Sequence, residues 1–258
     1  MFSIIALSRL DNGLLFWTEA ERRGFLERSL RLGTRWGVQV CAYHLCSAEV
    51  EFLVQGTPKA IESWLRLVHS SHSTTLLQCR GRRIRWARPE IHPVSDPARV
   101  ARNLHGLDPW NPWTSLWDAA GLRQLGCFKA SWLKEQASGQ THFRNAGGPT
   151  LPFGHGPLAP ASWEQILRAV DLVTWQASSR HSRVLITQLA HRAGWKTATL
   201  AAMLGVGPAA VRKSLSAPER PELKAAQAHL RHPALRAALR DDEPTVLNHT
   251  LPELQEAL

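Results

Sequence analysis

The stretch Ala42-Tyr43-His44-Leu45-Cys46-Ser47-Ala48-Glu49-Val50-Glu51-Phe52-Leu53 decides the expected fold of the first half of the chain. Residues 38–43 and 50–54 are apolar or alternate between apolar and polar, which is typical of two strands joined by a short turn. Glu49 and Glu51 occupy alternate positions of the second strand, so their side chains point to the same side of the sheet. This pair of acids is the first candidate for chemistry.

The segments around these two strands predict the rest of an α+β unit. A capping box at Thr18 and Glu21 and a proline at position 58 mark two helix starts. We expect strands at 3–8 and within about 83–91, and helices from Thr18 to Gly33, from Pro58, and from Asp96 through about His105. The order strand, helix, strand, strand, helix predicts a split βαβ, ferredoxin-like sheet.

Composition points to a nucleic-acid partner. The chain has 258 residues, enough for two domains, and a net charge of +10 with a pI near 10.3, which attracts polyanions. It contains no run of eighteen apolar residues, and its N-terminus lacks the features of a secretory signal. We therefore expect a cytoplasmic protein associated with the bacterial nucleoid, with no membrane partner. Its four cysteines lack zinc-type spacing, so buried thiols are expected.

Glycine and proline mark a domain boundary in the middle of the chain. Residues 138–161 contain Gly147-Gly148-Pro149 and several further glycines and prolines. We expect a first domain over 1–137, a linker over 138–161, a helical DNA-binding domain over 162–217 and a helical tail over 218–258. The segment after Arg240 is acidic and is expected to be loosely held.

Residues 199–215 fit a helix-turn-helix. Ala201 is small where two helices would cross, and Gly205 would turn the chain between them. The second helix of such a motif enters the major groove. The predicted DNA-contacting residues are Thr199, Ala209, Ala210, Arg212, Lys213 and Ser214. The alternative is a three-helix bundle that contacts other proteins.

A second basic segment precedes the last expected strand. Residues 80–88 read Arg-Gly-Arg-Arg-Ile-Arg-Trp-Ala-Arg, which could follow a phosphate backbone or form a solvated surface. The candidate DNA contacts are Arg80, Arg82, Arg83, Arg85 and Arg88. His69 and His72 lie three residues apart, but without a third ligand they do not predict a metal site.

With these motifs in order, residues 2 to about 126 resemble the REP-associated tyrosine transposases. Ser8-Arg9, Phe16, Glu21-Arg22-Arg23, Gly37 and Ala42-Tyr43 fall where that family has similar residues. The resemblance implies a nuclease fold in which two histidines bind a divalent metal, and those histidines fall at Glu49 and Glu51 here. The helical segment that follows resembles the DnaA-type or Trp-repressor-type domain carried by some members.

The family's nucleophile is also replaced. Its stretch Ala-Arg-Tyr-Ile-His aligns with Ala101-Arg102-Asn103-Leu104-His105, which places Asn103 at the tyrosine position. An amide cannot form the covalent link to DNA that the family's tyrosine forms. Tyr43, the only tyrosine, aligns with a framework residue. The resemblance therefore implies no transposase chemistry, no bound metal and no cofactor.

These observations predict a sequence-specific DNA-binding protein, a transcriptional regulator derived from a transposase. Double-stranded DNA is the expected partner, structured single-stranded DNA is left open, and a homodimer would supply two half-sites. One alternative is a nuclease that uses Glu49, Glu51 and a metal-bound water. The other is an adaptor that binds proteins.

Overall fold

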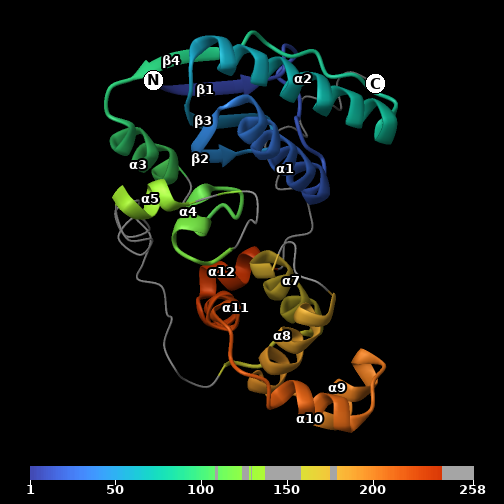
Figure 1. Ribbon diagram of the computed structural model, residues 1–258. Coiled ribbons are helices and arrows are strands. Elements are labelled where there is room, and N and C mark those ends of the chain that lie inside the picture. The colour runs from blue at the N-terminus through green and yellow to red at the C-terminus, as the bar shows by residue number, and fades with distance from the viewer. Residues whose placement is uncertain (108–109, 124–127, 129, 137–157, 175–178, 240–258) are drawn as a thin grey trace.

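The computed structural model describes residues 1–107, 110–123, 128, 130–136, 158–174 and 179–239 (Figure 1). The described chain is α+β, as expected, with one four-stranded antiparallel sheet and many helices. Most of the expected linker, Cys127 and the acidic segment after Arg240 lie outside the described residues. Within the described part, no helix is both long and apolar enough to cross a membrane.

The sheet has the order β2-β3-β1-β4, with antiparallel pairing between all neighbours. Helices α1 and α2 pack together on one face of it (Figure 1). Phe25 of α1, Phe52 of β3 and Trp64 of α2 are almost completely buried between the two layers. The elements are β1 (Phe2–Ser8), α1 (Glu19–Trp36), β2 (Gln39–Leu45), β3 (Glu49–Gln55), α2 (Pro58–Arg80) and β4 (Glu90–Val94).

Helix α1 begins as the sequence predicts but ends later. The Thr18 side chain accepts a hydrogen bond from the Glu21 backbone, and the Glu21 side chain accepts from Thr18, so the capping box is confirmed. The predicted end at Gly33 is wrong, because the helix continues to Trp36 and Gly37 adopts the left-handed cap with φ of 68°. At Gly33 a Cβ would lie 2.7 Å from the Val38 carbonyl oxygen, so glycine is needed for close approach of the chain.

The last strand starts later than predicted. It spans Glu90–Val94, whereas most of residues 83–89 form a loop over the ends of β1 and α2. Trp86 stacks on His69 of α2 with ring centroids 4.2 Å apart, and its indole N–H donates to Ser73 Oγ at 2.9 Å. This packing holds the loop on α2. Ala87 already donates a backbone hydrogen bond to the Ser8 carbonyl oxygen and Trp86 forms an isolated bridge with Arg9, but the regular pairing with β1 starts at Glu90.

In the described part of the chain, three short helices follow the sheet. They are α3 (Pro97–Leu107), α4 (Ser115–Ala119) and α5 (Ser131–Gln136). The expected helix start at Asp96 is confirmed, since the Asp96 carboxylate accepts a hydrogen bond from the Arg99 backbone at 2.9 Å. Helix α3 buries Ala101 and Leu104 and contacts β2 and β3.

The C-terminal part is helical. It contains α7 (Trp163–Thr174), α8 (Ser179–Arg192), α9 (Thr197–Leu204), α10 (Pro208–Leu215), α11 (Pro221–Arg231) and α12 (Pro233–Ala238). Helix α11 packs against α7 and α8 and buries Leu223, Ala226 and Leu230. The first part of the segment expected to be a helical tail is thus integral to this second core.

The two cores meet at the segment around α4. Leu116, Trp117 and Leu122 are buried with the C-terminal helices, although they precede the expected linker. His229 of α11 lies with Nε2 2.8 Å from the Leu122 carbonyl oxygen. A second connection is the ion pair between Arg168 of α7 and Glu19 of α1, at 2.8 Å. These contacts join the sheet and the helical part into a continuous structure.

Candidate nucleic-acid interface

Helices α9 and α10 are short and packed against each other. They lie at the end of the molecule farthest from the sheet (Figure 1). Gly205 ends α9 in the left-handed conformation with φ of 62°, and Pro208 starts α10. Leu200 and Val211 are buried between these helices and α8. The other apolar residues of the predicted motif, Leu204, Val206 and Leu215, are only partly buried.

Helix α10 is held in place from its C-terminal end. The Gln188 side chain of α8 donates to the carbonyl oxygens of Ser214 and Ala217, at 3.3 and 2.8 Å. Ser214 lies in the last turn of α10, and Ala217 follows the end of the helix. Gln188 thus fixes α10 relative to α8 and leaves its other face open.

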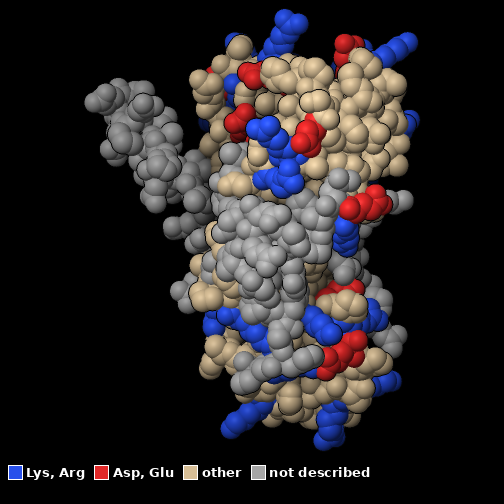
Figure 2. All heavy atoms as spheres, turned by 90° about the vertical axis from the view of Figure 1, so that its left-hand side faces the viewer, with Lys and Arg blue, Asp and Glu red and all other residues tan. Residues whose placement is uncertain are grey.

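The open face of α10 carries most of the predicted DNA-contacting residues. Ala209, Ala210, Arg212 and Lys213 are exposed, and Thr199 is exposed on α9. Ser214 differs, because its hydroxyl donates to the Ala210 carbonyl oxygen at 3.1 Å. Figure 2 shows basic side chains projecting at this end of the molecule. The small side chains of Ala209 and Ala210, next to the two cations, allow a polyanion to approach α10 closely.

The arginines of residues 80–88 lie elsewhere. Helix α2 ends at Arg80, near the sheet and at the opposite end of the molecule from α10 (Figure 1). Arg82, Arg83, Arg85 and Arg88 are exposed. The structure therefore separates the two predicted groups of DNA contacts.

Part of this basic segment lines a hollow of about 220 Å³, together with residues far away in sequence. Its floor includes the buried side chains of Leu76 and Ile84. Trp17 forms part of the wall, and the guanidinium carbons of Arg9 and Arg80 lie 5.7 and 5.2 Å from its ring centroid. The complete lining is Arg9, Trp17, Leu76, Arg80, Arg82, Arg83 and Ile84.

The four arginines of the hollow differ in their partners. Arg9 pairs with Asp11, and Arg80 pairs with Glu21. Among the described residues, neither Arg82 nor Arg83 has a carboxylate within ion-pair distance. The hollow therefore keeps an excess of positive charge.

Glu49 and Glu51 lie on β3, as predicted, and Glu51 has a basic neighbour. Glu51 is paired across the sheet with His44, and its Oε2 lies 3.8 Å from His44 Nδ1. Burial and the neighbouring charges of Glu51 and Glu90 raise the pKa of Glu49 above its usual value. Within the described part of the chain, no group of three or more His, Cys, Asp or Glu side chains is arranged to hold a metal ion.

His44 occupies a polar environment that the sequence did not reveal. Cys46 Sγ lies 3.8 Å from its Nδ1, and Asn111 Nδ2 lies 3.1 Å from its Nε2. Burial acts to lower the pKa of His44, but hydrogen bonding and charge from Cys46 and Glu51 outweigh it and raise that pKa to about 9. Protonated His44 partly neutralises the negative charge of Glu51.

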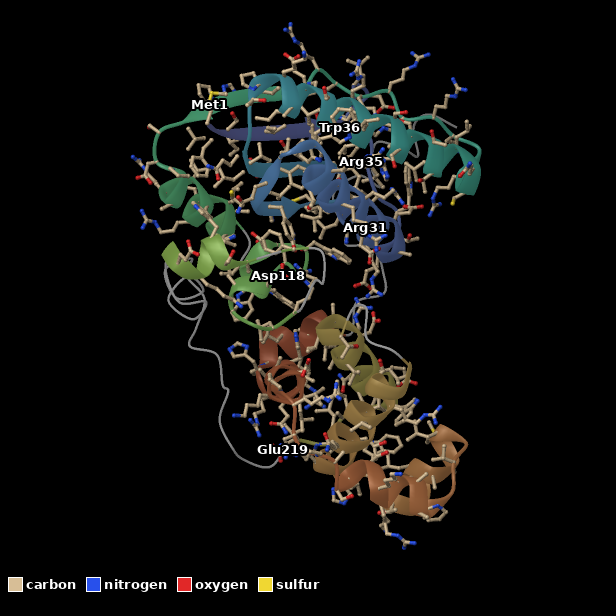
Figure 3. All side chains as sticks on the ribbon, in the orientation of Figure 1. Met1, Arg31, Arg35, Trp36, Asp118 and Glu219 are labelled. Atoms are coloured by element: carbon tan, nitrogen blue, oxygen red, sulfur yellow. The ribbon has the colours of Figure 1, made fainter. Side chains whose placement is uncertain are left out.

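Tyr43 is a buried structural residue. Its side chain is fully buried, and its hydroxyl donates to Asp118 Oδ2. Arg123 donates to the same carboxylate oxygen at 2.8 Å and to the Tyr43 hydroxyl at 2.6 Å. Figure 3 shows Asp118 on α4, between the sheet and the C-terminal helices. A hydroxyl held in this way cannot reach DNA.

Asn103 is exposed on α3 between the buried Ala101 and Leu104. On the face of the molecule that carries α3, basic and acidic side chains are interspersed (Figure 2). Among the described residues of this face, acidic side chains therefore interrupt the positive charge that is expected of a surface that follows a phosphate backbone.

Comparison of the chain with protein-family models, with curated proteins and with solved structures gave no match. The sequence did not predict the roles of Arg9 and Trp17 in the hollow, nor the group formed by His44 of β2 with Cys46 and Asn111. Of these residues, only Trp17, which lies next to the helix cap, was marked by a local signal in the sequence.

Proposed function

We propose that the protein is a sequence-specific DNA-binding protein, a transcriptional regulator derived from a tyrosine transposase and lacking transposase chemistry. The observation that carries the proposal is helix α10, which exposes Ala209, Ala210, Arg212 and Lys213 while Gln188 fixes its other side. In this proposal α9 and α10 are a helix-turn-helix, and α10 enters the major groove.

The first half of the chain supports a transposase origin. The element order and the strand order β2-β3-β1-β4 support the assignment of a ferredoxin-like split βαβ fold. Acids stand at both histidine positions of the resembled family, and Asn103 stands at its tyrosine position. We assign this domain a role in DNA contact or dimerisation, and a homodimer would present two α10 helices to two half-sites.

Binding of duplex DNA at several salt concentrations tests the role of α10. Replacing Arg212 and Lys213 by alanine is expected to weaken binding and to reduce the steepness of its salt dependence by about 1–2 units of log K against log salt. The matched control is Arg31→Ala with Arg35→Ala, which removes two exposed cations from α1. Equal loss in both double variants would mean that net charge, and not α10, determines binding.

A competing function is a metal-dependent nuclease. The observation that favours it is the acidic group of Glu49, Glu51 and Glu90, whose mutual repulsion contributes to the raised pKa of Glu49. Carboxylates are suitable ligands for magnesium or manganese. The pairing of Glu51 with His44 opposes this function, because a cation at that position competes with a metal ion. The adaptor alternative predicts no salt-sensitive affinity for DNA.

A further inference from the structure

The hollow lined by Arg9, Trp17, Arg80, Arg82 and Arg83 combines three features that a phosphorylated planar ligand needs. It has a partly buried indole, an apolar floor and two guanidinium groups without a carboxylate partner among the described residues. An aromatic ring and aliphatic side chains suit the face of a base. Guanidinium groups bind phosphate with two hydrogen bonds at once.

We propose that this hollow is a binding site for one phosphorylated nucleotide, with the base against Trp17 and the phosphate on Arg82 and Arg83. The site is separate from α10, which lies at the other end of the molecule (Figure 1). The inference therefore does not depend on recognition of duplex DNA by α10.

The size of the hollow limits its occupant. Its volume of about 220 Å³ is smaller than the roughly 300–1,000 Å³ of pockets that enclose drug-sized ligands. A single nucleotide unit is the largest piece of nucleic acid that such a space holds. The floor of Leu76 and Ile84 gives the site an apolar surface that inorganic phosphate would leave uncovered.

The arginines of the hollow divide into two pairs with different roles. Asp11 and Glu21 hold Arg9 and Arg80 in place near the ring of Trp17. Arg82 and Arg83 follow the left-handed cap at Gly81, where the chain leaves α2. The first pair shapes the wall, and the second pair supplies the charge that the ligand neutralises.

The same chemistry is present in a free nucleotide and in the 5′ end of a DNA strand. Isothermal titration calorimetry of the full-length protein with adenosine monophosphate, adenosine and inorganic phosphate at constant ionic strength tests the site. Short single strands with a 5′-phosphate or a 5′-hydroxyl form the second arm. Tighter binding of the phosphorylated strand than of the free nucleotide assigns the site to strand ends, and the reverse order assigns it to free nucleotides.

We expect saturable binding of the nucleotide that is tighter than that of adenosine or phosphate alone. Arg82→Ala with Arg83→Ala is expected to weaken it by roughly tenfold or more, because hydrogen bonds to charged groups are lost. Both side chains are exposed, so the variant is expected to fold. Trp17→Leu is the second variant, with thermal unfolding as its check, because Trp17 packs partly against the core.

The control is Arg31→Ala with Arg35→Ala. These residues lie on α1 at least about 18 Å along the helix from its start next to Trp17, by the rise of 1.5 Å per residue. Their removal is expected to leave nucleotide binding unchanged. The proposal is overturned by the absence of saturable binding, by equal binding of phosphate and nucleotide, or by equal weakening in the two double-arginine variants.

Discussion

The phenol of Tyr43 on β2 donates a hydrogen bond to the carboxylate of Asp118 on α4, and neither side chain is open to solvent. Arg123 donates to both groups, and its guanidinium is completely buried. A buried charge pair is stable only when its remaining hydrogen bonds are satisfied. Tyr43 therefore supports the junction between the sheet and the C-terminal helices.

Replacement of Tyr43 by phenylalanine tests this role. The variant removes one hydroxyl from a buried network, so the free energy of unfolding is expected to fall by about 1–3 kcal/mol. Urea denaturation measures the change. DNA affinity at low temperature, where the variant is folded, is expected to equal that of the wild type. An unchanged stability would contradict the structural role.

Because two histidines are buried in the neutral form, we expect the protein to lose stability in acid. Burial lowers the pKa of His72 and of His229 to about 4. Because an unfolded chain has a histidine pKa near 6.5, the unfolded state takes up protons first as the pH falls, and stability is lost between about pH 6.5 and pH 4. Each histidine contributes on the order of a few kcal/mol to this loss.

Chemical denaturation at several pH values measures this effect. His72→Gln is the matched variant, and in it the fall in stability between about pH 6.5 and 4.5 is expected to be shallower. A wild-type stability that stays constant over this range would show that these histidines are accessible to protons in the folded state.

The contribution of His44 to stability depends on pH in the opposite direction. Its pKa is raised to about 9, so the folded state binds a proton that the unfolded state has released above about pH 6.5. The contribution of His44 to stability is complete below about pH 6.5 and disappears as the pH rises through about 9. Titration of the His44 ring by nuclear magnetic resonance is expected to give a midpoint well above 6.5 that falls in Glu51→Gln. A midpoint at or below 6.5 would exclude the proposed charge pair.

Local signals in the sequence predicted the starts of several elements. The capping box at Thr18 and Glu21 and Pro58 at the start of α2 depend on residues within one helical turn, so they could be read directly. The end of α1 was not predictable in this way. Gly33 is needed because the Val38 carbonyl approaches it, whereas the helix ends at the left-handed cap of Gly37, so a glycine in the sequence did not by itself mark the helix end.

Long-range contacts account for the parts of the site that sequence analysis overlooked. Trp17 joins Arg82 and Arg83 only because α1 and α2 pack on the same face of the sheet. Tyr43 and Asp118 are 75 residues apart. No pattern of spacing predicts such pairs. The exposed residues of α10, by contrast, followed from its helical period, because burial of Val211 directs the opposite face outward.

The nuclease alternative makes its own prediction. If Glu49 and Glu51 held a metal ion, labelled hairpin or duplex DNA would be cleaved with magnesium or manganese, and Glu49→Ala would abolish cleavage. We expect no cleavage that depends on Glu49, because His44 already pairs with Glu51. Metal-dependent cleavage that disappears in this variant would require an enzymatic function.

The most direct test of sequence-specific binding is selection of bound fragments from genomic DNA. The wild-type protein and the variant with Arg212→Ala and Lys213→Ala are compared under the same salt conditions. We predict that the wild type enriches fragments that share a common sequence, and that this enrichment is lost in the variant. Wild-type fragments that show no enrichment above random DNA would contradict the proposed function.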